Sequence, residues 1–216
     1  MTAAGTGPED VPPGGHGSRA QLVVLVRHGE TEWSRTGKHT GRVDVPLDPA
    51  GEEQARWIER RLHEWHFAQV LTSPLLRARR TCEIAGFAAV AQVDADAQEW
   101  DYGQYEGRTT DDIRLERPGW NIWHDGVVGG ETIEDVGRRA ERVMGRIQAV
   151  TGDVALFAHG HFLRILTTRW CGLPERAGEH LDLSAGAVSV LGFDRESPVI
   201  WRWNDTSHLS GGHLRW

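Results

Sequence analysis

Three features that define whole classes of protein are scarce or missing in this sequence: cysteine, long apolar runs and a net positive charge. Only two cysteines occur, Cys82 and Cys171, so no disulfide framework is expected and a reducing, cytoplasmic location is predicted. No apolar run approaches the roughly 20 residues of a membrane-spanning helix, so no membrane partner is expected. The formal net charge of −7 argues against nonspecific binding to nucleic acid.

Sequence patterns typical of a signal peptide and of a P-loop are also missing. Residues 1–19 contain no basic region followed by an apolar one, so they are not expected to be a signal peptide. Their Gly, Pro and small polar residues predict a disordered N-terminal tail instead. The chain has no GxxxxGK(S/T) loop, so any phosphate site in it must be built in another way.

Residues 20–216 are expected to form one domain, in which predicted strands and helices alternate. Short apolar runs predict strands at 21–26, 67–73, 89–95 and 153–158, and a closing hairpin of 187–193 and 199–203. Apolar spacing and capping residues predict helices at 48–66, 74–87, 109–117, 131–151 and 161–172. This alternation indicates an α/β fold, a three-layer α/β/α sandwich with a mostly parallel sheet and helices on both faces.

Polar and basic residues follow three of the predicted strands, at the point where each strand ends. They are Arg27 and His28 after the first strand, Arg77 in the helix after the second, and His159, Gly160 and His161 after the fourth. Because ligands bind beyond the carboxyl ends of such strands, these side chains are expected to converge. Arginine grips phosphate oxygens with a planar fork, and the helix that Ser73 is expected to cap offers free N–H groups to an anion. The sequence therefore predicts a phosphate site.

Five spaced motifs carry a resemblance to a known family. They are LVRHGETEW, SPLLRARRT, EWDYGQYEG, GGET and FAHGHFLR, in this order. The set resembles the histidine phosphatase superfamily, in its phosphoglycerate-mutase-like branch, over residues 21–203. Within that branch it is similar to small bacterial acid phosphatases and to sedoheptulose-1,7-bisphosphatase. The resemblance implies that residues 20–216 are a catalytic domain that hydrolyses phosphomonoesters of small metabolites, with sugar phosphates among the candidates.

The resemblance also implies a role for each convergent residue. His28 would be the nucleophile that forms a phosphohistidine, and nearby guanidinium charge would help to keep it neutral. Arg27, Arg77 and His159 would hold the equatorial phosphate oxygens and neutralise charge in the transition state. Glu99 would be the general acid that protonates the leaving alcohol and then activates water. Since this acid must start protonated, an acidic pH optimum is expected.

The remaining candidate residues have less defined roles. Asp101 and Glu106 lie close to Glu99 in the sequence, and either of them stays open as an alternative acid. Lys38 and His39 are candidates to add charge toward a second anionic group. The substrate contacts implied by the resemblance are Ser34, Thr40, Gly41, Tyr102, Gly160 and His161, of which His161 is equally expected as a structural cap.

The short interval from Glu99 to Glu131 helps to distinguish hydrolysis from mutase-type phosphoryl transfer. Phosphoglycerate mutases carry an insertion with paired arginines in this interval; its absence here favours hydrolysis over phosphoryl transfer. Mutase-type transfer stays an alternative, as does an idle protein that only binds phosphorylated ligands. Specificity is expected to lie in residues 108–130, where Trp120 and Trp123 either form a substrate lid or plug the loop against the core. Glu131 is either a helix N-terminal charge or a site residue.

No metal and no other cofactor is expected. His159 and His161 have ligand-like spacing, but they lie at one strand end without an obvious carboxylate as third ligand. The expected partner is a small phosphorylated metabolite. The C-terminal hairpin permits a homodimer without requiring one.

Overall fold

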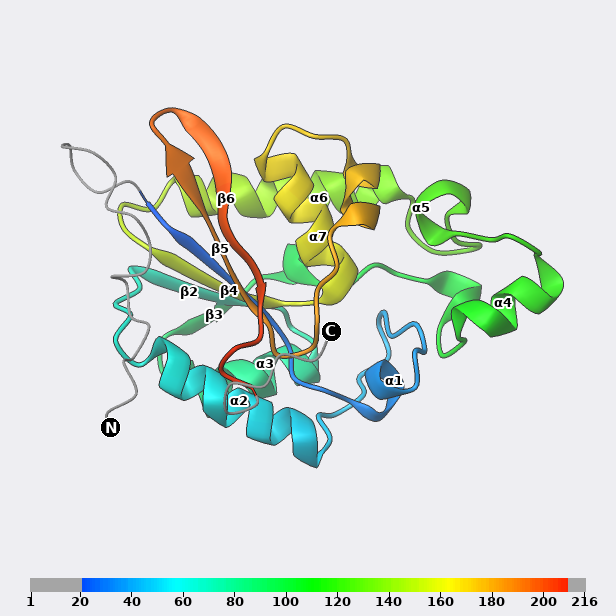
Figure 1. Cartoon of the computed structure of the whole chain (residues 1–216), viewed down its shortest axis with the longest axis horizontal. Helices are drawn as coiled ribbons and strands as arrows, with labels where there is room; N and C mark the ends of the chain where they lie inside the picture. Colours follow the sequence, from blue (N-terminus) through cyan, green and yellow to red (C-terminus); the bar gives the residue numbers. More distant parts are fainter. Residues whose placement is uncertain (1–20, 210–216) are drawn as a thin grey trace.

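The computed structural model of the chain describes residues 21–209, which are arranged around one mixed sheet (Figure 1). The tail expected at residues 1–19 lies outside the described residues. The sheet has the strand order β3-β2-β4-β1-β5-β6. Strands β3, β2, β4 and β1 run parallel to one another, β5 is antiparallel to β1, and β6 is antiparallel to β5. The strands are β1 Val23–Arg27, β2 Gln69–Thr72, β3 Ala91–Val93, β4 Val154–Ala158, β5 Val188–Asp194 and β6 Ser197–Asp205.

The central strand β1 is apolar from Val23 to Val26 because helices cover both of its faces. Val23 and Leu25 belong to one buried cluster and Val24 and Val26 to another. The first cluster includes the apolar stripe of α6 Ile133–Gln148 and the buried side of α7 Gly160–Trp170. The second includes residues of α2 Pro49–Leu62 and α3 Leu76–Cys82. The three-layer α/β/α sandwich with a mostly parallel sheet is thereby confirmed.

The short helices α1 Glu32–Arg35, α4 Thr110–Glu116 and α5 Ile122–Asp125 lie beyond the carboxyl ends of the parallel strands, on one side of the molecule (Figure 1). Helix α1 falls in a polar stretch for which no helix was expected. It forms because Thr31 and Ser34 make a capping box, in which each side chain bonds the other's backbone N–H. No helix within residues 21–209 is long and apolar enough to cross a membrane.

The expectation that Ser73 caps the helix after β2 is wrong. Helix α3 begins at Leu76, its N-cap is Leu75, and it has no side-chain cap. The N–H of its first residue is also not free for a ligand, because Leu76 N donates to Asp44 Oδ1 at 2.6 Å. The helix passes into a π-helical turn, Glu83–Phe87, within which Gly86 adopts a non-helical φ of 91°. Ser73 has a different partner, described below.

Candidate active site

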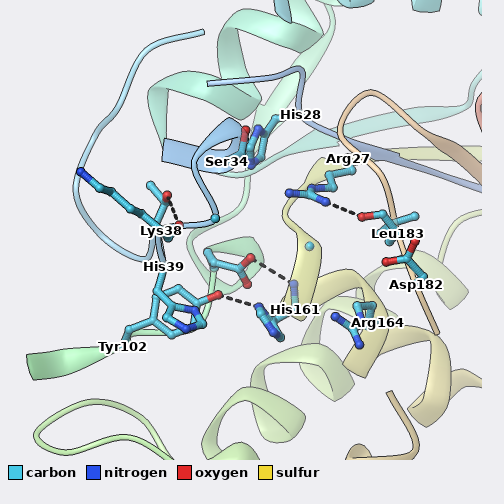
Figure 2. Close-up of a pocket in the computed structure, with 14 residues that line it drawn as sticks. Arg27, His28, Ser34, Lys38, His39, Tyr102, His161, Arg164, Asp182 and Leu183 are labelled. Atoms are coloured by element: carbon cyan, nitrogen blue, oxygen red, sulfur yellow. Dashed lines mark hydrogen bonds between the residues drawn. The ribbon is translucent and has the colours of Figure 1, made fainter. Parts of the chain in front are cut away.

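A cavity of about 210 Å³ opens at the carboxyl ends of β1 and β4 (Figure 2). It is lined by residues from the end of β1, from the segment 34–40, from the segment around Glu99, from the start of α7 and from residues 182–183. Of the eleven catalytic and substrate-contact residues that the resemblance implies, eight line it: Arg27, His28, Ser34, Thr40, Glu99, Tyr102, Gly160 and His161. Lys38 and His39, the two residues expected to add charge, line it as well. The other three of the eleven, Gly41, Arg77 and His159, lie behind this wall.

His28 is held in one tautomer by its own chain. Its backbone N donates to Ala158 O at 3.0 Å, which continues the β1–β4 ladder past Arg27. Its Nδ1 lies 2.7 Å from Gly29 O. A carbonyl oxygen can only accept, so Nδ1 carries the proton and Nε2 keeps its lone pair. Burial, together with the charges of Arg77 and Arg27, lowers the pKa of His28 well below its usual value, so the imidazole is neutral.

His159 lies beside His28, with the two ring centroids 5.2 Å apart. Its Nε2 is 2.7 Å from Ser73 Oγ, and Ser73 Oγ already accepts the N–H of Leu75 at 3.3 Å. The buried hydroxyl of Ser73 must donate its own proton to an acceptor, and His159 Nε2 is the acceptor within hydrogen-bond distance. His159 therefore carries its proton on Nδ1, which is buried and has no hydrogen-bond partner among residues 21–209. Burial and the charge of Arg77 lower the pKa of His159 well below its usual value.

Arg27 supplies positive charge at the end of the cavity that holds His28. Its Nη1 donates to the carbonyl of Leu183 (Figure 2), while its Nε is buried without a partner in the described part of the chain. Gly160 leaves room beside it: a Cβ at that position would lie 3.4 Å from Arg27 Cζ and 3.7 Å from Glu99 Oε2. The space between Arg27 and Glu99 therefore depends on the absence of a side chain at residue 160.

Arg77 is fully buried behind the cavity wall. Its Nη2 donates to Thr40 O and Gly41 O, both at 2.9 Å, and its Nη1 donates to Val43 O at 3.1 Å. These bonds hold the loop that forms one side of the cavity, and they leave Nε and one Nη1 hydrogen unused. Gly41 is required by close packing, because a Cβ there would lie 2.6 Å from Glu106 Oε2. The structure places neither residue on the cavity surface.

Glu99 projects into the cavity and also binds the first turn of α7. Its Oε1 accepts from Trp100 N and Phe162 N, both at 2.9 Å, and its Oε2 accepts from His161 N at 3.0 Å. The carboxylate thus satisfies two N–H groups at a helix N-terminus, where a negative charge is stabilised. Oε1 has both lone pairs occupied, whereas Oε2 has one left for a proton or a ligand.

The two alternative acids lie elsewhere. Asp101 pairs with Arg42 at 2.8 Å and accepts from Gly103 N at 3.0 Å. Glu106 accepts from the backbone N–H groups of residues 41–43, and burial raises its pKa. Neither carboxylate lines the cavity. Among the three acids considered from the sequence, the geometry therefore favours Glu99.

The far end of the cavity combines neutral rings with one pair of opposite charges. Tyr102 Oη and His161 Nδ1 are 2.7 Å apart (Figure 2), and burial lowers the pKa of His161 well below its usual value. Burial likewise lowers the pKa of His39 to about 4, so this ring adds no charge, contrary to expectation. Arg164 and Asp182 complete this end.

Sequence reasoning missed Arg164 and Asp182. Arg164 lies three residues after His161, on the same face of α7, and helical spacing offered a signal for it. It is fixed there by Gly178 O, which accepts from its Nε at 2.9 Å, and by Trp123, over which its guanidinium lies at 4.5 Å. Asp182 comes from an irregular segment, and no pattern pointed to it.

Residues 108–130 are not among those that line the cavity, so the expectation that they determine specificity stays a prediction. Trp120 and Trp123 are buried and form the plug rather than the lid. Trp120 packs against His39, with ring centroids 5.6 Å apart, and Trp123 against His161, at 5.2 Å. The segment therefore supports the cavity rings from behind.

Within residues 21–209, no group of three or more His, Cys, Asp or Glu side chains is arranged to hold a metal ion. The two histidines with ligand-like spacing have other partners. His159 Nε2 binds Ser73, and His161 Nδ1 binds Tyr102.

The fold gathers two histidines, two arginines and a glutamate at the carboxyl ends of the parallel strands, without a P-loop. The sequence profile of the histidine phosphatase superfamily (branch 1) matches residues 23–206. An acid phosphatase of Mycobacterium tuberculosis is 36% identical over 182 residues, which cover 82% of this chain and 89% of that protein. Sedoheptulose 1,7-bisphosphatase of Saccharomyces cerevisiae is 38% identical over 185 residues, which cover 69% and 67%.

A solved structure of the product of a Mycobacterium tuberculosis open reading frame is similar throughout, with a TM-score of 0.82 and 34% identity over 86% of this chain and 98% of that one. The chain belongs to the histidine phosphatase superfamily, branch 1.

Proposed function

We propose that this chain is a phosphomonoester hydrolase that acts on small phosphorylated metabolites through a phosphohistidine at His28. The observation that carries the proposal is the state of His28: buried, neutral, protonated on Nδ1 and beside two guanidinium groups. A neutral imidazole with a free Nε2 lone pair is a nucleophile, and a fixed tautomer aims it. The names of the two relatives, acid phosphatase and sedoheptulose 1,7-bisphosphatase, support the same class of reaction.

The first step forms a P–N bond and breaks the ester P–O bond. His28 Nε2 attacks phosphorus in line with the leaving oxygen, while Arg27 binds the phosphoryl oxygens through its free Nε–H. Arg77 Nε–H and His159 Nδ1–H, both buried and unpartnered within residues 21–209, are the further donors that neutralise charge in the transition state. A proton on Glu99 Oε2 passes to the leaving alcohol.

The second step reverses the roles. Glu99, now ionised, takes a proton from water, whose oxygen attacks the phosphohistidine phosphorus. The P–N bond breaks, its electron pair returns to His28 Nε2, and inorganic phosphate leaves. Because the leaving group of the first step needs a protonated Glu99, we keep the expectation that activity is highest at acidic pH.

The far end of the cavity favours a polyol as the rest of the substrate. It offers a carboxylate, a guanidinium, a phenol and neutral imidazoles from Asp182, Arg164, Tyr102, His39 and His161, and the cation Lys38 lines the same cavity. Hydroxyl groups both donate and accept, so they match such a mixture better than a second phosphate, which only accepts at neutral pH. We therefore propose sugar and polyol monophosphates as the substrate class.

Three further expectations remain proposals. We propose that residues 20–216 act as one catalytic domain and that the protein works in the cytoplasm, where the free thiols of Cys82 and Cys171 persist. The homodimer permitted by the sequence stays a prediction to be settled by light scattering.

The test is hydrolysis of p-nitrophenyl phosphate from pH 4 to 8, with and without a chelator, by the wild type and by His28→Ala. We expect turnover that survives chelation, and a loss of at least about 1,000-fold in the variant because the nucleophile is gone. An acid-labile phosphoenzyme should be trapped with labelled substrate in the wild type alone. A variant that still traps label, or turnover that needs a metal, would contradict the mechanism. Release of the label to added alcohols rather than to water would favour transfer of the mutase type.

A further inference from the structure

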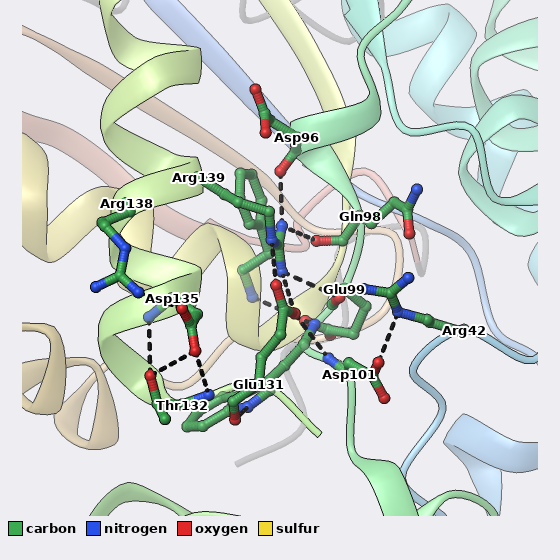
Figure 3. A network of polar contacts seen from close by, with 12 residues as sticks. Arg42, Asp96, Gln98, Glu99, Asp101, Glu131, Thr132, Asp135, Arg138 and Arg139 are labelled. Atoms are coloured by element: carbon green, nitrogen blue, oxygen red, sulfur yellow. Dashed lines mark hydrogen bonds and ion pairs between the residues drawn. The ribbon is translucent and has the colours of Figure 1, made fainter. Parts of the chain in front are cut away.

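Two charged residues next to the site, Arg139 and Glu131, form a pair that the proposed chemistry does not use (Figure 3). Arg139 lies on α6, and Glu131 precedes the N-cap of the same helix. Arg139 Nε and Nη2 each donate to one oxygen of the Glu131 carboxylate, both at 2.7 Å. The two side chains are only 11% and 15% exposed, and neither lines the cavity. The pair is thus largely buried, bidentate and outside the cavity.

The rest of Arg139 binds the backbone of the segment that carries Glu99. Its Nη1 donates to Asp96 O at 2.6 Å and to Gln98 O at 2.8 Å, and its Nη2 donates to Glu99 O at 3.3 Å. With the two bonds to Glu131, all five N–H donors of the guanidinium are used. Lysine could not replace this fork, because it has a single nitrogen.

Glu131 binds the same segment from its other end. Its Oε2 accepts from Asp101 N at 3.0 Å, and its carbonyl accepts from Trp100 Nε1 at 2.8 Å. Its own N–H donates to Asp101 O at 3.0 Å. The segment from Asp96 to Asp101 is therefore held at both ends by one buried ion pair, with Glu99 in the middle (Figure 3).

The same pair also reaches the helix turn that the Glu99 carboxylate binds. The Arg139 guanidinium lies 5.3 Å from the centre of the Phe162 ring, and Phe162 N donates to Glu99 Oε1. Arg139 thus contacts the backbone of Glu99 on one side and a residue that holds its carboxylate on the other. A shift of the guanidinium would move both supports of the carboxylate together.

We infer that Arg139 and Glu131 are positioning residues that hold the Glu99 carboxylate at the leaving-group oxygen of the substrate. The inference rests on the proposed role of Glu99 as general acid. Its specific consequence is chemical: loss of Arg139 should impair proton donation more than it impairs binding. A misplacement of about 1 Å of a catalytic group can cost on the order of 100-fold in rate.

Helix α6 provides a matched control one turn further on. Arg142 binds the side chain of Asp96, with Nη2 to Oδ1 at 2.6 Å, and its side chain is 52% exposed. It touches the same segment but bonds no backbone group of residues 98–101. Arg142→Ala therefore removes an ion pair from this helix and this segment without releasing Glu99.

The experiment compares two substrates that differ in their need for an acid. p-Nitrophenolate leaves without a proton, whereas the alkoxide of glycerol 2-phosphate needs one. For Arg139→Ala we expect kcat/KM on glycerol 2-phosphate to fall by about 10- to 100-fold and on p-nitrophenyl phosphate by less than about threefold. Arg139→Lys, which keeps the charge and guards against misfolding, should show the same split. Arg142→Ala should change both values by less than about twofold.

The variant Glu99→Gln distinguishes a failure of the proposed acid role of Glu99 from a failure of the positioning role of Arg139. It should show the same split as Arg139→Ala, and adding Arg139→Ala to it should cause little further loss, because both act on one proton transfer. If Glu99→Gln shows no split, the proposed acid is wrong and the inference falls with it. If Glu99→Gln shows the split but both Arg139 variants lose activity equally on the two substrates, the acid role stands and the positioning role is overturned. Full additivity with Glu99→Gln overturns it as well.

Discussion

Replacement of His159 by glutamine should reduce the dependence of stability on pH. His159 is fully buried, and its surroundings lower its pKa far below the usual value, chiefly through burial and through the charge of Arg77. The folded protein therefore keeps this ring neutral in mild acid, whereas the unfolded chain protonates it below about pH 6.5. Since the unfolded state binds more protons there, the free energy of unfolding falls as the pH decreases.

The size of this effect follows from the linkage relation. For a group that is neutral when folded and has an unfolded pKa of about 6.5, the loss between pH 7 and pH 5 is about 2 kcal/mol. The other histidines of the site with a lowered pKa, His28, His161 and His39, contribute with the same sign, but they are present in both proteins and cancel in the comparison. Glutamine at residue 159 is neutral at every pH, so the variant should lose about 2 kcal/mol less than the wild type.

The assay is urea denaturation of the wild type and of His159→Gln at pH 7 and pH 5, followed by tryptophan fluorescence. The variant is expected to be less stable at pH 7, because Ser73 loses its partner. That offset does not matter, since the prediction concerns the change with pH. Equal losses in the two proteins, within about 0.5 kcal/mol, would show that His159 is not held neutral and would refute the reasoning.

Two further substitutions probe the supports of the site. Ser73→Ala should lower the free energy of unfolding by about 1–3 kcal/mol, because a buried imidazole nitrogen loses its partner, and it should lower kcat because the tautomer of His159 is no longer fixed; wild-type kcat would count against the tautomer assignment. Gly41→Ala should destabilise the protein by about 1–3 kcal/mol, because the added Cβ would lie 2.6 Å from Glu106 Oε2. The control Gly145→Ala, at an open position in the last turn of α6, should instead stabilise it by about 0.5–1 kcal/mol. Thermal melts of the two variants measure the change in stability. Equal changes for Gly41→Ala and Gly145→Ala would contradict the packing argument.

Several elements of the fold were predictable because their causes are local. The continuous apolar run of β1 indicates a strand buried on both faces, and the apolar spacing in α6 indicates an amphipathic helix. The convergence of His28 and His159 was also predictable, because parallel strands place their carboxyl ends at one edge. In each case the signal lies within one element or in a general rule of topology.

The roles of Ser73 and Glu131 were not predictable in this way. A serine before a proline is a typical helix N-cap, yet Ser73 binds a histidine 86 residues away. Glu131 had two open interpretations, and the structure supports neither alone, since its carboxylate binds Arg139 and a backbone N–H of a distant segment. Arg139 itself is one of several arginines on a polar helix face, and the sequence does not distinguish it from Arg142.

The sequence by itself determined which chemical groups this protein has and to which end of the sheet they are delivered, because strand and helix patterns depend on neighbours a few residues apart. Only the tertiary structure decided the protonation states of these groups, the hydrogen-bond donors that bind them and how rigidly they are held. His28 is neutral because burial and the charges of Arg77 and Arg27 act on it together, and Glu99 is held by residues more than 30 positions away. Electrostatic and hydrogen-bond energies depend on distance in space, and that distance exists only once the chain has folded.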